Sequence, residues 1–230
     1  MLDIAVTHAL LREVAAGRRG PAVRVFLPGP TVAFGRLDAL REGFAAACEA
    51  ARRHGHTPVI RSAGGHAAVY DASCVVVEHV TPEDDVTAGL QDRFAAQSGL
   101  LRDVLLGLGL DARIGELRGE YCAGAHSINL DGRLKVVGIA QRAIRGAALT
   151  TAVITVQDGP RLRALIGDVY DALGLDVVPS TAGTLDERLP GITAGRVAAL
   201  VAAAYGGAPA LLDDELVAAA RVLLPRHVAS

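Results

Sequence analysis

The sequence predicts an α/β (α+β) fold: a mixed central β-sheet with flanking helices, followed by a helical C-terminal segment. Apolar residues alternate with period two in several short segments and recur with helical spacing in others. Several strand-like segments are joined by tight turns, of which Asp131-Gly132 is the strongest signal, so a purely parallel sheet is excluded. With 230 residues, 51% of them hydrophobic, the chain is long enough to bury one sizeable core.

The expected elements follow these signals along the chain. Strands are expected at residues 22–27, 31–34, 59–61, 67–70, 74–79, 127–130, 134–140 and 147–156, with a short one around Ile114. Helices are expected at residues 3–16, 41–54, 86–106, 161–173, 194–205 and 214–224. Asp3 is a candidate N-cap, and the acidic run 83–85 suits the positive end of the helix dipole at residues 86–106. No internal repeat is present, so residues 1–230 are expected to form a single domain whose portion 160–230 is mostly helical.

Composition narrows the function. Aromatic residues make up 3% of the chain and Trp is absent, which argues against a surface that stacks nucleic-acid bases. The net charge of −2 provides no general attraction to nucleic acid or to an anionic membrane. No apolar run approaches the roughly 20 residues that a membrane-spanning helix needs. The three cysteines are an odd number without repeated spacing, so we expect a cytoplasmic protein without a disulfide scaffold.

Residues 119–145 are the segment most difficult to explain by folding alone. Cys122 lies in a loop of small residues, where its thiol is either a nucleophile or an incidental surface cysteine. A thiol nucleophile needs a nearby cation or base, for which Lys135 and His126 are candidates. Lys135 interrupts an apolar strand, so we expect it to be buried beside a negative group rather than to extend along an exposed strand.

The segment Arg61-Ser-Ala-Gly-Gly-His66 is rich in glycine. It either cradles a ligand or makes a tight connection between two strands. Gly35 and Gly64-Gly65 are expected where another group closely approaches the backbone.

Other polar and thiol groups have simpler interpretations. Cys48 and Cys74 are expected in the core, and His54 and His56 are expected to face solvent. Cys122 and His126 lack a second Cys/His pair, so no metal site is expected.

Three segments together resemble the biotin/lipoate protein ligase superfamily. They are residues 61–71 with the Gly-Gly pair, Tyr121-Cys-Ala-Gly124, and residues 132–142 with the pattern Lys-x-x-Gly-x-x-Gln-Arg. The resemblance is closest to the cysteine-dependent octanoyl- and lipoyl-transferases, in particular the lipoyl amidotransferases. It implies a catalytic domain with the class II aminoacyl-tRNA synthetase/biotin synthetase-like fold.

The resemblance also implies a reaction. Cys122 and Lys135 would be catalytic: Cys122 would carry the acyl group as a thioester, and Lys135 would bind the acyl carbonyl. The implied substrate-binding residues are Arg61, Gly64, Gly65, His66, Tyr121, Gly124, Gly138, Gln141 and Arg142. An octanoyl or lipoyl group would pass from an acyl carrier protein or the glycine cleavage H protein to a lysine of a lipoyl domain, with no cofactor required.

Two alternatives remain. One is an ATP-dependent lipoate–protein ligase, which would need ATP and Mg; the other is a non-catalytic relative that binds an acyl group or its carrier. Such ligases typically carry a second Arg where this chain has Ile60 and a third Gly where it has His66, which disfavours the ATP-dependent alternative. The transferases typically carry Pro where this chain has Ala123.

Three arginines lie around the proposed site in the sequence, Arg133, Arg142 and Arg145. They either help to dock an acidic carrier domain or are solvated residues at strand ends.

Overall fold

The computed structural model describes residues 1–85, 87, 89–208 and 210–229, and it is built around two β-sheets. The large sheet has six strands in the order β1 (Ala22–Phe26), β5 (Cys74–Glu83), β9 (Gly146–Thr155), β8 (Leu134–Ile144), β7 (Ile128–Leu130) and β6 (Ala112–Ile114). Each neighbouring pair in it is antiparallel. The small sheet has the order β3 (Thr57–Ile60), β2 (Thr31–Phe34) and β4 (Ala68–Tyr70), with β2 parallel to β3 and antiparallel to β4. The predicted fold class is confirmed, and the parallel pairing lies in the small sheet.

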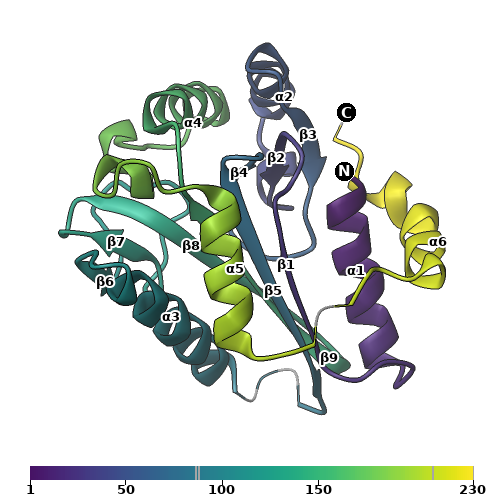
Figure 1. Ribbon diagram of the computed structural model, residues 1–230. Coiled ribbons are helices and arrows are strands. Elements are labelled where there is room, and N and C mark those ends of the chain that lie inside the picture. Colours follow the sequence, from purple (N-terminus) through teal and green to yellow (C-terminus); the bar gives the residue numbers. More distant parts are fainter. Residues whose placement is uncertain (86, 88, 209, 230) are drawn as a thin grey trace.

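Helices cover both faces of the large sheet (Figure 1). The α-helices are α1 (Leu2–Ala15), α2 (Phe44–Arg53), α3 (Leu90–Gly107), α4 (Gly159–Leu173), α5 (Ala194–Tyr205) and α6 (Asp214–Leu223). The short 3-10 helices are η1 (Asp38–Leu40), η2 (Pro179–Thr181), η3 (Leu185–Glu187) and η4 (Leu224–His227). On one face lie α3 and α5; on the other lie α1, with α6 against it, and the small sheet with α2 and α4.

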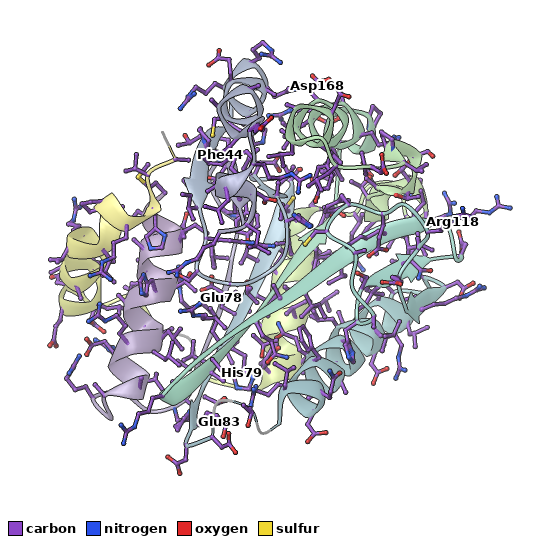
Figure 2. The ribbon with its side chains drawn as sticks, turned by 180° about the vertical axis from the view of Figure 1, so that it is seen from behind. Phe44, Glu78, His79, Glu83, Arg118 and Asp168 are labelled. Carbon is purple, nitrogen blue, oxygen red and sulfur yellow. The ribbon has the colours of Figure 1, made fainter. Side chains whose placement is uncertain are left out.

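The central strand β5 shows how the sequence sets these layers. Its side chains alternate, so Val75 and Val77 pack in the core under α3 and α5. Val76 packs against the small sheet, and Val80 packs against α1. A strand buried on both faces is apolar almost throughout, which explains the run of valines. Figure 2 follows β5 through Glu78 and His79 to Glu83 at its far end.

The segment before α3 corrects two expectations, the end of the strand at residues 74–79 and the role of the acidic run 83–85. The strand β5 continues to Glu83, whose carboxylate pairs with Arg93 of α3, and the helix itself begins at Leu90. The interpretation of the acidic run 83–85 as a helix-dipole partner is therefore wrong. The predicted start of this helix at Val86 lies outside the described residues.

The predicted turn at Asp131-Gly132 is confirmed. Both residues have positive φ, 55° and 69°, as the tight turn between β7 and β8 requires. At the other end of the chain, the expected N-cap Asp3 is wrong, because α1 begins at Leu2 with Met1 as its N-cap.

The expected close approach at Gly35 is also confirmed. A Cβ at Gly35 would lie 1.8 Å from the carbonyl oxygen of Gly65, so the end of β2 packs directly on the glycine-rich loop. Cys48 and Cys74 are buried, as predicted.

The prediction that His56 faces solvent is wrong. His56 is 2% exposed, and its Nε2 lies 3.5 Å from the carboxylate of Asp71. His54, by contrast, bonds through Nε2 to Asp168 of α4 at 2.7 Å, where α2 and α4 lie side by side (Figure 2).

Across the described residues, no helix is long and apolar enough to cross a membrane. A single domain over residues 1–230 stays a prediction.

Candidate active site

Cys122 lies in the loop between β6 and β7 and has an unusual backbone conformation. Its φ is +43°, and it is half-buried. A non-glycine residue at positive φ costs of the order of 1–3 kcal/mol and persists only where its surroundings fix it. The neighbouring contacts identify what fixes this loop.

The ammonium group of Lys135 is hydrogen-bonded to the cysteine loop. It donates to Glu120 Oε1, to the carbonyl oxygen of Tyr121 and to that of Cys122, each at 2.8 Å. These bonds use all three donors of the ammonium group. The prediction that Lys135 is buried beside a negative group is confirmed, and that group is a carboxylate of the protein itself.

Glu120 closes the same loop through its other contacts. Its Oε1 also accepts from Ser127 Oγ at 2.6 Å and from the backbone N–H of Gly124 at 3.3 Å. Sequence reasoning missed Glu120, although a carboxylate two residues before the cysteine and a lysine inside an apolar strand were available as signals.

The guanidinium group of Arg61 faces the sulfur from the glycine-rich loop. Arg61 is buried, and its Nη2 lies 3.5 Å from Cys122 Sγ. Burial alone would lower the pKa of Arg61, but the negative charges that Cys122 and Tyr70 can carry outweigh it and raise the pKa above its ordinary value. A guanidinium in this position can pair with a negative charge on the attacking sulfur.

A glycine at position 65 is required for Cys122 Sγ and Arg61 Nη2 to lie this close to the loop. An added Cβ would lie 2.7 Å from Cys122 Sγ and 2.9 Å from Arg61 Nη2, and φ of Gly65 is +87°. The glycine-rich loop is thus also a tight connection between strands, but its glycine makes room for the cysteine.

Two tyrosines pack behind the cysteine. The ring of Tyr121 has Lys135 Nζ 4.7 Å from its centroid and meets Tyr170 edge-on at 6.5 Å. The hydroxyl of Tyr170 donates to the carbonyl oxygen of Ala67 at 2.9 Å. Burial raises the pKa of both phenols, so they act as neutral packing groups near neutral pH.

A narrow cavity of about 20 Å³ lies beside Cys122 between the two sheets. Apart from Cys122, Arg61, Thr151 and two tyrosines, its lining is apolar. The small residues Ala68, Gly138 and Ala140 leave the space, and Val69, Ile139 and Val153 complete the wall. The apolar lining suits a hydrocarbon chain whose reactive end lies at the sulfur, but the cavity would have to widen to hold that chain.

Of the other predicted substrate-binding residues, Gly64 contacts β8, whereas the side chains of Gln141 and Arg142 interact with helices. The backbone N–H of Gly64 donates to the carbonyl oxygen of Gln141 at 3.2 Å, which ties the glycine-rich loop to β8. The Gln141 side chain, however, bonds to Arg93 and Leu90 of α3. The charge of Arg142 acts on His8 of α1. Substrate binding by Gln141 and Arg142 therefore stays a prediction.

His126, the second candidate activator, is held by α3. Its ring stacks on Phe94 at 5.0 Å, and its Nε2 lies 3.1 Å from Gln91 Oε1. These contacts do not direct it to the sulfur.

The arginine group proposed for carrier docking does not form one surface. Arg133 and Arg145 flank the 11-residue strand β8 at opposite ends, about 40 Å apart at a rise of about 3.3 Å per residue. Neighbours in sequence are here separated by the length of a strand, which favours the alternative of solvated residues at strand ends, and carrier docking stays a prediction.

Asp38 is the second residue that sequence reasoning missed. It is fully buried, accepts from the backbone N–H of Gly35 at 2.9 Å, and bonds to His66 Nδ1 at 2.6 Å. No sequence signal marked it, because its partner lies 28 residues later in the chain. Among the residues that the structure describes, no group of three or more His, Cys, Asp or Glu side chains could hold a metal ion.

Three relatives of known description are similar to this chain. An octanoyl-[GcvH]:protein N-octanoyltransferase of Geobacillus kaustophilus is 28% identical over 197 residues, which cover 81% of this chain and 69% of the relative. The enzyme of the same description from Exiguobacterium sibiricum is 31% identical over 200 residues, covering 81% and 71%. A lipoyl-[GcvH]:protein N-lipoyltransferase of Listeria monocytogenes is 24% identical over 197 residues, covering 81% and 70%.

Solved structures share the fold. A lipoate-protein ligase A bound with ATP superposes with a TM-score of 0.74 at 20% identity, covering 98% of this chain and 89% of the other. The bi-partite lipoate protein ligase of Thermoplasma acidophilum gives a TM-score of 0.70 at 18% identity, covering 98% and 87%. Residues 2–205 match the family model of the lipoyl protein ligase A/B catalytic domain, and the chain therefore belongs to that family.

Proposed function

We propose that this protein is an octanoyl/lipoyl-protein N-acyltransferase that carries the acyl group as a thioester on Cys122 and delivers it to a lysine of a lipoyl domain. The observation that carries the proposal is the position of Cys122, with Arg61 Nη2 3.5 Å from its sulfur and an apolar cavity beside it. The relatives' activities toward GcvH support the glycine cleavage H protein as the donor.

The reaction divides into two acyl transfers. In the first, the Cys122 sulfur bonds to the acyl carbonyl carbon, and the bond to the donor's lysine nitrogen breaks as that nitrogen takes a proton. In the second, the acceptor's lysine nitrogen bonds to the same carbon and releases the sulfur. Because one lysine amide is broken and an equivalent one is formed, the overall transfer is close to neutral in free energy, and no ATP is required.

The surrounding residues would position the two reactants. Arg61 would stabilise a thiolate, and the narrow apolar cavity would widen to take the hydrocarbon chain. Lys135 would fix the cysteine loop, and it could reach the acyl carbonyl only by releasing one of its three present acceptors. We place the reaction in the cytoplasm, because unpaired cysteines suit a reducing compartment.

The test is the intact mass of the protein after incubation with octanoyl-GcvH and no ATP, beside the variant Cys122→Ser. The expected result is a gain of one octanoyl group that hydroxylamine removes and that the variant lacks. A lipoyl domain added afterwards should take up the octanoyl group.

Two other results would replace the proposed transferase activity. Acylation of the lipoyl domain that requires ATP and free octanoate and persists in Cys122→Ser would replace the proposal with a ligase. An unmodified cysteine together with measurable binding of octanoyl-GcvH would indicate a non-catalytic relative.

A further inference from the structure

The guanidinium group of Arg61 is buried, yet one of its donors is unused. Arg61 is 5% exposed, and its Nη2 donates to the carbonyl oxygen of His66 at 2.8 Å and lies 3.5 Å from Cys122 Sγ. Within the described part of the chain, Nε of the same group is buried and has no hydrogen-bond acceptor. An unpaired buried donor costs free energy, so its presence beside a nucleophile indicates an acceptor that arrives with the substrate.

This donor group is within reach of an acyl oxygen at the sulfur. Arg61 and Cys122 line the same narrow cavity. In a thioester the carbonyl carbon bonds directly to Sγ, so its oxygen lies one bond further on. Since Nη2 already lies 3.5 Å from Sγ, that oxygen can come within the roughly 2.7–3.1 Å that an oxyanion donor requires. Nε–H and the adjacent N–H of Nη2 project from one edge of the planar group, so a single oxygen can accept from both.

Two other donors near the cysteine are already bonded. Lys135 gives its three donors to Glu120 and to two carbonyl oxygens of the cysteine loop. The hydroxyl of Tyr170 donates to the carbonyl oxygen of Ala67 at 2.9 Å. Each would have to release an acceptor before it could bind an acyl oxygen, whereas Nε of Arg61 has no acceptor to release.

The loop around Arg61 fixes the group before any charge develops. The His66 carbonyl oxygen holds Nη2, and Gly65 leaves the space beside it free, because a Cβ there would lie 2.9 Å from Nη2. A guanidinium also keeps its charge throughout the working pH range. Donors that are fixed in advance stabilise a developing negative charge without having to reorient.

We propose that Arg61 is a catalytic residue that holds the acyl carbonyl oxygen while this oxygen is negatively charged; this inference rests on the proposed function. In the first half, the Cys122 thiolate bonds to the carbonyl carbon, and the electron pair of the C=O bond moves onto the oxygen beside Arg61. That pair returns as the bond to the donor's lysine nitrogen breaks, and the nitrogen takes up a proton equivalent to the one that the thiol lost.

The second half uses the same donors. The neutral lysine nitrogen of the acceptor bonds to the thioester carbon, and the C=O electron pair again moves onto the oxygen beside Arg61. When that pair returns, the sulfur leaves as a thiolate and the new amide nitrogen loses a proton. Arg61 supplies no proton in either half, so its contribution is electrostatic.

The experiment compares acylation with alkylation of Cys122 in Arg61→Met and the wild type. Both rates are followed by intact mass, with the octanoyl thioester of N-acetylcysteamine as acyl donor and iodoacetamide as alkylating agent. Alkylation displaces iodide and forms no oxyanion, so its rate reports the thiolate alone. We expect the ratio of the acylation rate to the alkylation rate to fall about 100-fold or more in Arg61→Met.

Two further variants separate this role from a structural one. Arg61→Lys keeps the charge beside the sulfur but not the planar pair of donors, so its ratio should lie between those of Arg61→Met and the wild type. The matched control is Arg41→Met, whose arginine donates to the carbonyl oxygens of Leu173 and Gly174. Its ratio should equal that of the wild type.

The outcomes that would overturn the proposal differ from those that would overturn the proposed function. Acylation and alkylation that fall by the same factor in Arg61→Met would limit Arg61 to the thiolate or to the loop and would leave the thioester route intact. An unchanged acylation rate would remove Arg61 from the mechanism. A wild-type protein that iodoacetamide alkylates at Cys122, but that neither octanoyl-GcvH nor the octanoyl thioester acylates, would remove both proposals.

Discussion

The ammonium nitrogen of Lys135 lies 2.8 Å from a carboxylate oxygen of Glu120, and neither side chain is exposed to solvent. Removing one partner of such a pair leaves a buried charge without compensation. We therefore expect Lys135→Met to lower the free energy of unfolding by about 3–5 kcal/mol, measured by urea denaturation.

The double variant Lys135→Met/Glu120→Gln separates charge from function. Because it buries no unpaired charge, it should be more stable than Lys135→Met alone, yet it should form little octanoyl-Cys122 because the loop has lost its anchor. A double variant that loses the full sum of both single effects would contradict this account.

Gly65→Ala should inactivate the protein through the position of the sulfur. Its new methyl group would lie 2.7 Å from Cys122 Sγ at a backbone φ of +87°. Displacing a reacting atom by about 1 Å can cost about 100-fold in rate, which thioester formation would report. Gly64→Ala is the matched control, because its nearest contact would be the Gln141 carbonyl oxygen at 3.9 Å. Equal loss in both variants would refute the argument.

Ala140→Leu tests the cavity as the site of the acyl chain. The larger side chain would project from β8 into the cavity that lies beside Cys122. We expect the preferred chain length to shorten, so that hexanoyl transfer gains relative to octanoyl transfer in a competition measured by mass. An unchanged ratio would place the chain elsewhere.

Acid should weaken the contact between α1 and η4. Burial, with added repulsion from His227 and Arg12, lowers the pKa of His8 from 6.5 to about 4, and its Nδ1 lies 3.1 Å from His227 Nε2. Between about pH 4 and pH 6.5, His8 therefore binds a proton in the unfolded chain but not in the folded protein. The contribution of His8 to the free energy of unfolding is fully present above about pH 6.5 and is lost as the pH falls toward 4.

The measurement is the free energy of unfolding at pH 7 and pH 5 for wild type and His8→Gln. The variant should lose less stability on acidification than the wild type. Identical losses would mean that His8 does not carry the effect.

Much of the fold followed from local signals. A few adjacent residues determine each of three features: the turn at Asp131-Gly132, the doubly buried strand β5 and the close approach at Gly35. Predictions failed where distant residues decide. His56 is buried with its Nε2 3.5 Å from the carboxylate of Asp71, and Glu83 ends a strand and pairs with Arg93.

The sequence by itself determined the fold class and the family resemblance, and it identified Cys122, Lys135 and Arg61 as candidates for the chemistry. Periodicity and short motifs are local properties, so one chain is enough to read them. Only the tertiary structure decided how these residues are used. In the folded protein the Lys135 ammonium group bonds to Glu120 and the cysteine loop, and the Gln141 side chain bonds to α3. Asp38 lies against His66. Such pairings depend on which distant segments become neighbours in space, and packing of the two sheets sets that.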